Sequence, residues 1–161
     1  MRFLKAVGIG STVALTALLT FASAADAAGA AKARGEASFT LVAKSTGQTA
    51  VDVDRDGMGP GDYVVFTDDL FDKETKVGNA GTVCTLISEH NHGEAQCVFT
   101  FRSAHGDITA QALANGILSS RPKSFDAAIT GGTDSFADVR GYIHGTTDNP
   151  SEVTLAFHVD Y

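Results

Sequence analysis

Tryptophan is absent from the 161 residues, proline occurs three times and cysteine only twice. Without tryptophan, core volume has to come from the 10 phenylalanines and from Val, Leu and Ile. Positive charge is also scarce, because 12 Lys and Arg stand against 19 Asp and Glu for a net charge of −7. Phosphate backbones and anionic membrane surfaces repel an acidic chain, which argues against both as partners.

Motifs of several common enzyme classes are also missing. The chain has no P-loop and no dinucleotide fingerprint, and it lacks the Gly-x-Ser-x-Gly elbow of serine hydrolases. The pair Cys84 and Cys97 does not make a zinc site. We therefore expect no cofactor and no metal ion in the protein.

The composition favours one folded domain. A length near 150 residues is typical of a single domain, and a hydrophobic content of 43% is enough for a core rather than for disorder. Seventeen glycines suit a fold with many tight turns.

Residues 1–27 have the pattern of a secretory signal peptide. A short basic start is followed by an uncharged apolar run over 7–21, and small residues then allow cleavage after Ala24 or Ala27. An anchoring helix is the alternative, but the run is shorter than the roughly 20 residues that span a bilayer. We expect a secreted protein that does not insert into the membrane after cleavage, with a flexible leader over 28–35 and a folded domain over 36–161.

The periodicity after residue 35 is that of β-strands. Val153, Leu155, Phe157 and Val159 place a large apolar side chain at every second position, as in a strand with one buried face. Turn residues separate the candidate strands, which indicates an antiparallel sandwich or barrel. The expected strands are 38–43, 48–53, 63–67, 77–87, 97–102, 106–113, 125–130, 139–146 and 153–159. The signal Ser45-Thr46-Gly47 places a turn between the first two.

Some strands are apolar on both faces, notably 63–66 and 97–99. A barrel strand that faces water on its outer side should alternate strictly. Two apolar faces therefore predict a filled or ligand-binding interior together with an outer surface that packs on a partner, and a homo-oligomer would satisfy this.

The two cysteines flank the polar loop 89–94, and each lies in a β-rich run. For an exported protein a disulfide between Cys84 and Cys97 across this hairpin is favoured. Closing a loop of this size would stabilise the fold by roughly 3 kcal/mol. The alternative is two unpaired thiols, one of them in a ligand cavity.

Two clusters have the spacing of metal ligands. Asp52-x-Asp54-x-Asp56-Gly57 resembles the start of a calcium loop, but Tyr63 stands where the final bidentate Glu belongs. A solvated acidic turn is favoured, with a weak structural calcium site as the alternative. His90-x-His92 has no third ligand nearby, so a plain hairpin tip is favoured.

The segment 128–141 is more specific, because a strand runs into Gly131-Gly132 and resumes with Arg140-Gly141. This pattern requires positive φ in the turn and a strand that is bent or closely approached at Gly141. It resembles the Gly-Gly-Thr/Ser…Arg-Gly signature of plant dirigent proteins and allene oxide cyclases. Segments 61–70, 78–87, 99–101 and 106–111 resemble further allene oxide cyclase motifs in the same order.

The resemblance implies an all-β, eight-stranded antiparallel barrel, commonly trimeric, with an apolar cavity. Plant cyclases of this kind close an unsaturated fatty-acid epoxide, and dirigent proteins hold phenoxy radicals while they couple. In both cases the protein acts mainly by positioning a reactive guest.

The resemblance also implies site residues. Asp68 stands at the position of an Asn that helps to hold a catalytic water. Asp134 and Arg140 match dirigent positions and would serve as charged groups at the cavity mouth, with a loop Asp and an Arg paired for structure as the alternative. Cys84 matches a cavity cysteine. The first-strand Glu of the plant cyclases has no counterpart in 39–43. Our predicted catalytic residues are Asp68, Asp134 and Arg140. The predicted cavity residues are Phe66, Cys84, Phe99, Phe101, Gln111 and Phe157.

Three functions remain open. The first is an isomerase-type cyclase that acts on a hydrophobic small molecule, with Asp68 as the proton donor or acceptor. The second is a non-catalytic dirigent-like or lipocalin-like protein that guides or carries a phenolic or lipid ligand. The third is a surface structural protein whose interior is filled by its own side chains.

Overall fold

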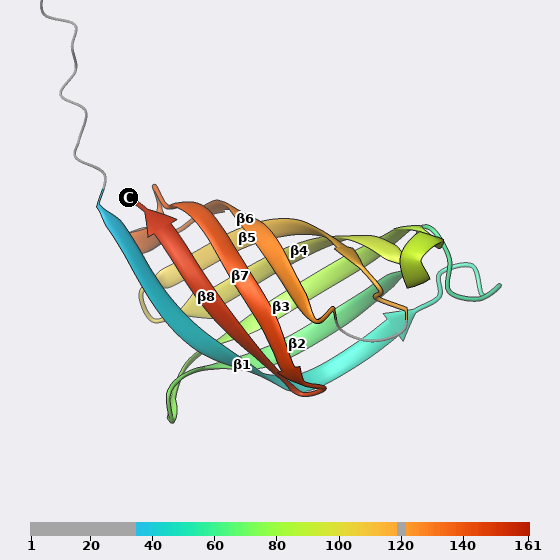
Figure 1. Ribbon diagram of the computed structural model, residues 1–161, viewed down its shortest axis with the longest axis horizontal. Helices are drawn as coiled ribbons and strands as arrows, with labels where there is room; N and C mark the ends of the chain where they lie inside the picture. The colour runs from blue at the N-terminus through green and yellow to red at the C-terminus, as the bar shows by residue number, and fades with distance from the viewer. Residues whose placement is uncertain (1–34, 119–121) are drawn as a thin grey trace, which may run out of the picture. The chain divides into compact units, whose positions relative to one another are not determined.

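The computed structural model describes residues 35–118 and 122–161 of the chain as a closed antiparallel β-barrel (Figure 1). Its eight strands are joined in sequence order, and β1 closes the barrel against β8. The predicted all-β, eight-stranded antiparallel barrel is confirmed. The strands are β1 (Glu36–Val51), β2 (Tyr63–Asp72), β3 (Thr75–Ser88), β4 (Glu94–Ser103), β5 (Gly106–Asn115), β6 (Ser124–Gly132), β7 (Arg140–Asn149) and β8 (Glu152–Asp160).

The signal peptide and nearly all of the leader predicted from the sequence lie outside the described residues. Within those residues, no helix has the length and apolar character needed to cross a membrane. The only helical segments there are the short 3-10 turns η1 (His90–His92) and η2 (Asp134–Phe136).

β1 closes the barrel because it is long enough to pair on both sides. Its first half pairs with β8, and its second half pairs with β2. The register with β2 shifts between Ser45 and Gly47, which is the geometry of a bulge, and a bulge bends a strand. The sequence prediction of two strands separated by a turn at this point is wrong. The turn-forming residues Ser45, Thr46 and Gly47 form an irregularity inside one continuous strand.

The two ends of the barrel carry different loops. One end holds the β1–β2 loop, η1 and the β5–β6 connection, and we call it the mouth end. The opposite end holds the β2–β3 and β4–β5 turns and the η2 loop, and we call it the η2 end. At the η2 end, Thr133 N donates to Asp107 O over 2.9 Å, and Ser135 N donates to His105 O over 3.1 Å. The η2 loop is thus tied to the β4–β5 turn, and Val139 at its end is fully buried.

The buried hydrophobic residues form one cluster in the interior of the barrel, to which the inward residues of every strand contribute. Val153, Leu155, Phe157 and Val159 of β8 all point inward and are buried, as the alternation in the sequence predicts. Phe157 stacks on Phe39 with 4.6 Å between ring centroids, and it meets Phe101 edge to face at 5.2 Å.

Where a strand is apolar on both faces, one face points into the barrel and the other lies on its outer surface. On β3 and β4, Cys84, Cys97 and Phe99 point inward and are buried, whereas Val83 and Val98 face outward and are 42% and 45% exposed. The second apolar face therefore lies on the surface of the barrel.

Candidate functional site

A pocket of about 70 Å³ occupies the interior of the barrel toward the mouth end. Its volume is roughly half that of a ~150 Å³ cavity that holds benzene, so a flat or slender group fits it better than a branched one. All eight strands and the β5–β6 connection contribute to its lining. The lining residues are Ala43, Phe66, Asp68, Ala80, Thr82, Cys84, Cys97, Phe99, Phe101, Ala114, Ile117, Pro122, Phe125, Thr147, Val153 and Leu155.

The strand register orders the lining by depth. The deepest row runs from Asp68 on β2 through Ala80 on β3 to Phe101 on β4. The next row toward the mouth contains Phe66, Thr82 and Phe99, and the row above it contains the two cysteines. Ala114, Ile117 and Pro122 line the pocket nearest the mouth end.

Polar groups are few in this lining. Asp68 and Thr82 are 6% and 8% exposed, and they are two of the three buried polar or charged residues of the described chain. Among the described lining residues, Asp68 is the only one with an ionisable side chain. Buried polar groups are informative because burial without a partner is costly. The two residues occupy diagonal positions on neighbouring strands, so a single guest could contact both.

One wall of the pocket is aromatic. Phe99 and Phe101 are stacked at 6.0 Å with their planes 5° apart, and Phe99 and Phe125 are stacked at 5.4 Å with planes 7° apart. The three rings are nearly parallel and come from two strands that are not hydrogen-bonded neighbours, β4 and β6. They form an extended apolar surface of one orientation in the pocket wall.

The predicted disulfide is confirmed, since Cys84 and Cys97 are bonded with an S–S distance of 2.00 Å. The two residues are direct partners in the β3–β4 register, and both side chains point inward. The disulfide is therefore part of the pocket wall as well as a crosslink.

Four of the six predicted cavity residues line the pocket: Phe66, Cys84, Phe99 and Phe101. Phe157 instead belongs to the core beneath Phe101. Placing Gln111 in the cavity is a mistake, because the structure puts it exposed on the outer face of β5. The inward residues of β5 are Ile108, Ala110, Ala112 and Ala114.

The structure does not place the predicted charged residues Asp134 and Arg140 with Asp68. Both lie at the η2 end of the barrel, opposite the mouth, and both are exposed. Asp134 has a φ of +52°, and Arg140 Nη1 donates to the carbonyl of Val139 over 2.6 Å. The prediction that they lie at the cavity mouth is wrong. Their participation in catalysis stays a prediction.

Several lining residues were not anticipated from the sequence, chiefly Thr82 and Phe125. Thr82 could have been found, because it lies two residues before Cys84 on the same face of one strand. Phe125 gave no such signal. β5 lies between β4 and β6, so the contact of the two rings depends on how the sheet curves across β5 and not on spacing in the sequence.

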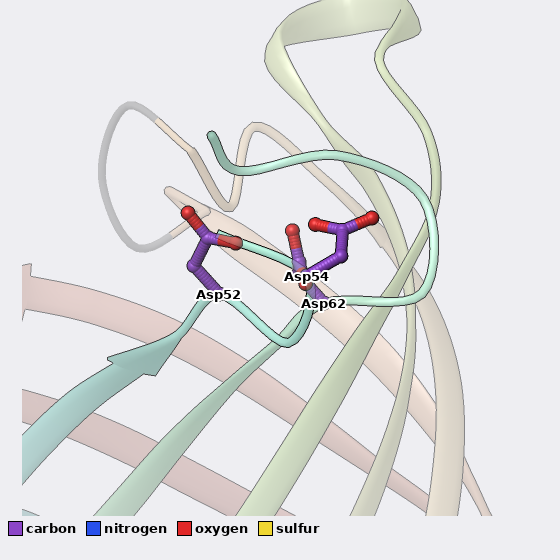
Figure 2. Close-up of side chains that lie close together, drawn as sticks. All are labelled: Asp52, Asp54 and Asp62. Carbon is purple, nitrogen blue, oxygen red and sulfur yellow. The ribbon is translucent and has the colours of Figure 1, made fainter. Parts of the chain in front are cut away.

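A second cluster lies in the β1–β2 loop at the mouth end, where carboxylate oxygens of Asp52, Asp54 and Asp62 lie within 4.8 Å of one another (Figure 2). The oxygens of two of these residues already accept hydrogen bonds from the loop backbone. Asp52 accepts from the amides of Arg55 and Gly57 at 2.6 and 3.0 Å. Asp62 accepts from Val53 and Gly59 at 2.7 and 2.9 Å. These contacts give the acidic residues a role in shaping the loop.

The same contacts explain the electrostatics of the loop. Hydrogen bonds from Val53 and Gly59 stabilise the charged form of Asp62 and lower its pKa. The pKa of Asp56 is raised, first by a hydrogen bond with Asp54 and then by the negative charge of Asp54. His90 and His92 belong to η1 and are not part of the carboxylate cluster.

No protein-family model and no curated protein matches the chain, but solved structures share its barrel. A pyocyanin demethylase is 26% identical with a TM-score of 0.65, and the match covers 76% of this chain and 99% of that one. The dirigent protein GePTS1, a pterocarpan synthase, is 21% identical with a TM-score of 0.55, covering 79% and 84%. The exo-specific intermolecular Diels-Alderase AbnU is 12% identical with a TM-score of 0.56, covering 79% and 99%.

These likenesses confirm at the level of the fold the resemblance found in the sequence. The barrel is of the kind found in dirigent proteins and in cyclases.

Proposed function

We propose that the pocket binds a hydrophobic small molecule and promotes its cyclisation or isomerisation, with Asp68 as the acid or base. The observation that carries the proposal is the position of Asp68. Its carboxyl is buried in the deepest row of a pocket whose other described lining residues do not ionise. A general acid or base needs such a position, within reach of a bound guest and away from bulk water.

The chemistry follows from this arrangement. The apolar walls would hold the guest in one conformation, so that its reacting atoms stay close together. An isomerisation has no net change in protons, so one carboxyl can give a proton to one atom of the guest and take a proton from another. The hydroxyl of Thr82, one row nearer the mouth, is placed to orient a polar atom of the guest.

Two of the structural neighbours support a reaction of this class, whereas the pyocyanin demethylase is named for a different one. A Diels-Alderase forms rings, and the dirigent neighbour is named a pterocarpan synthase. Because these proteins are 12% and 21% identical to this chain, they support the kind of work that the barrel can do and not a particular substrate.

A non-catalytic binding protein is the alternative. Two observations favour it: the first strand carries no acidic residue over 39–43, where the plant cyclases have one, and Cys84 is in a disulfide. Such a protein would hold or guide the same hydrophobic guest without exchanging protons with it.

The test begins with native mass spectrometry of protein purified from its producing cells, to identify any retained molecule. Turnover of that molecule, or of its acyclic precursor, is then compared for the wild type, Asp68→Asn and Asp69→Asn. Asp69 is the matched control because it neighbours Asp68 but faces outward and pairs with Lys76 at 2.7 Å. We expect Asp68→Asn to lose about 10²–10⁴-fold in turnover and to keep binding, while Asp69→Asn keeps both.

Two results would contradict the proposal. Full turnover by Asp68→Asn would remove the proposed acid or base. A guest that the wild type binds tightly and always returns unchanged would favour the binding protein.

We further propose that the protein works outside the cytoplasm. The disulfide and the signal-peptide pattern of 1–27 support this, because disulfides persist in oxidising compartments. Mass determination of the secreted protein should give an N-terminus at Ala25 or Ala28, and an uncleaved chain retained in the cells would contradict it.

A further inference from the structure

The Cys84–Cys97 disulfide is sealed from bulk solvent on every side except the pocket. Cys84 and Cys97 are 2% and 1% exposed. On the outer side, the backbones of β3 and β4 lie between the sulfur atoms and water, with Val83 and Val98 covering the surface. On the inner side, both cysteines belong to the pocket lining.

The approach from the mouth is lined by Ala114, Ile117 and Pro122, and its side on β5 carries only small side chains. On β5, Ala112 is the register partner of Cys97, and the next inward residue toward the mouth is Ala114. Ala114 itself lines the pocket. A small molecule that enters the pocket therefore meets the disulfide before it reaches the deepest row of Asp68 and Phe101.

We infer that the disulfide is a pocket-gated exchange site for small thiols. A low-molecular-weight thiolate that enters through the mouth attacks one sulfur atom, the Cys84–Cys97 bond breaks, and a mixed disulfide forms with that cysteine. The other cysteine leaves as a thiolate and takes a proton from water. A second thiol can release the first as its own disulfide, leaving both cysteines reduced.

This inference goes beyond the proposed function, because it needs the pocket but neither a substrate nor Asp68. It also separates classes of reductant by size. A protein reductant such as thioredoxin cannot enter a space of about 70 Å³, whereas 2-mercaptoethanol is small enough to do so.

The experiment measures opening of the disulfide in the folded protein by alkylation of the released thiols and mass spectrometry. The wild type is treated with increasing 2-mercaptoethanol, and separately with reduced thioredoxin. We expect the rate to rise in proportion to the 2-mercaptoethanol concentration, past the rate of global unfolding, and thioredoxin to react at no more than the unfolding rate. A plateau at the unfolding rate for both reductants would overturn the inference.

A pair of variants locates the route of access. Ala114→Phe narrows the pocket above the disulfide, and Leu113→Phe puts the same aromatic side chain on the outer face of the same strand, where Leu113 is 55% exposed. We expect at least a tenfold slower reaction in Ala114→Phe and an unchanged rate in Leu113→Phe. Equal rates in two folded variants would contradict access through the pocket. If Ala114→Phe does not fold, the concentration dependence of the wild type still decides the question.

Discussion

Two buried aspartates of this protein lie in different parts of the fold. Asp62, 4% exposed, accepts hydrogen bonds from two backbone amides and holds the β1–β2 loop together. Asp68, 6% exposed, lies in the wall of an apolar pocket. The buried carboxyl of Asp62 therefore stabilises the loop, whereas we propose that the buried carboxyl of Asp68 acts as an acid or base.

The pKa of Asp62 leads to a prediction about acid. Hydrogen bonds from Val53 and Gly59 lower this pKa below the ordinary value of 3.8. The contribution of Asp62 to stability is therefore complete above about pH 3.8 and is lost as the pH falls through the lower, folded-state value. We expect the amide resonances of Val53 and Gly59 to shift together in that range while barrel amides stay in place.

The variant Asp62→Asn tests this assignment. It should abolish the acid transition of the two amides and loosen the loop already at neutral pH, because an amide group cannot accept both hydrogen bonds as a carboxylate does. Asp72→Asn, at the exposed β2–β3 turn, should leave the transition unchanged. An unaltered transition in Asp62→Asn would show that another group titrates.

The sequence could identify individual inward residues only where a motif or an alternation marked them. Asp68 and Phe66 were found through the resemblance of 61–70, and β8 through its alternation. Gln111 was misplaced because β5 has alanines inside and larger residues outside. The reason is steric: Phe99 is the register partner of Ala110, so the interior has room for only a methyl group there.

At the scale of the strand, glycines set how closely neighbours approach. Gly141 on β7 has a φ of +126°, and a Cβ at this position would overlap the carbonyl oxygen of His158 on β8. The sequence pattern predicted this close approach, and the structure confirms it. Gly81 on β3 has no such constraint, because no atom lies within 4 Å of its would-be Cβ.

This contrast predicts opposite effects of one substitution. Gly141→Ala should lower the free energy of unfolding by about 2–4 kcal/mol, from backbone strain together with the steric overlap. Gly81→Ala should raise it by about 0.5 kcal/mol, because alanine loses less conformational freedom on folding. Urea unfolding of both variants would decide, and a Gly141→Ala variant as stable as the wild type would show that β7 and β8 can move apart.

At the scale of the whole molecule, charge is unevenly placed around the barrel. The central outer face of β2–β5 carries no charged residue, and we call it the uncharged face. It comprises Tyr63, Val65, Thr67, Gly81, Val83, Thr85, Ile87, Gln96, Val98, Thr100, Thr109, Gln111 and Leu113. Toward their ends these strands carry Asp69, Glu94, Arg102 and Asp107, and on β6–β8 charged residues include Asp126 within β6 and Glu152 and Asp160 at the ends of β8.

An uncharged face is suited to meeting a copy of itself. In a two-fold symmetric oligomer the same surface of each copy comes together, and a face of one charge would repel its own copy. Because the net charge is −7, we expect this repulsion between copies to be strong elsewhere on the surface of the molecule. The barrel is closed by β1 and β8, so association relies chiefly on outward side chains of this kind.

We therefore expect the protein to form a homo-oligomer through the uncharged face. Val98, 45% exposed at its centre, should be sensitive to charge, so that Val98→Lys gives a monomer by size-exclusion chromatography with light scattering. Tyr142→Lys is the matched control, because Tyr142 is a similarly exposed apolar residue, at 49%, on β7 outside this face. A wild-type protein that stays monomeric at high concentration, or two variants that assemble alike, would contradict the expectation. The two apolar strand faces seen in the sequence would then mean only that the barrel tolerates exposed valines on its outer side.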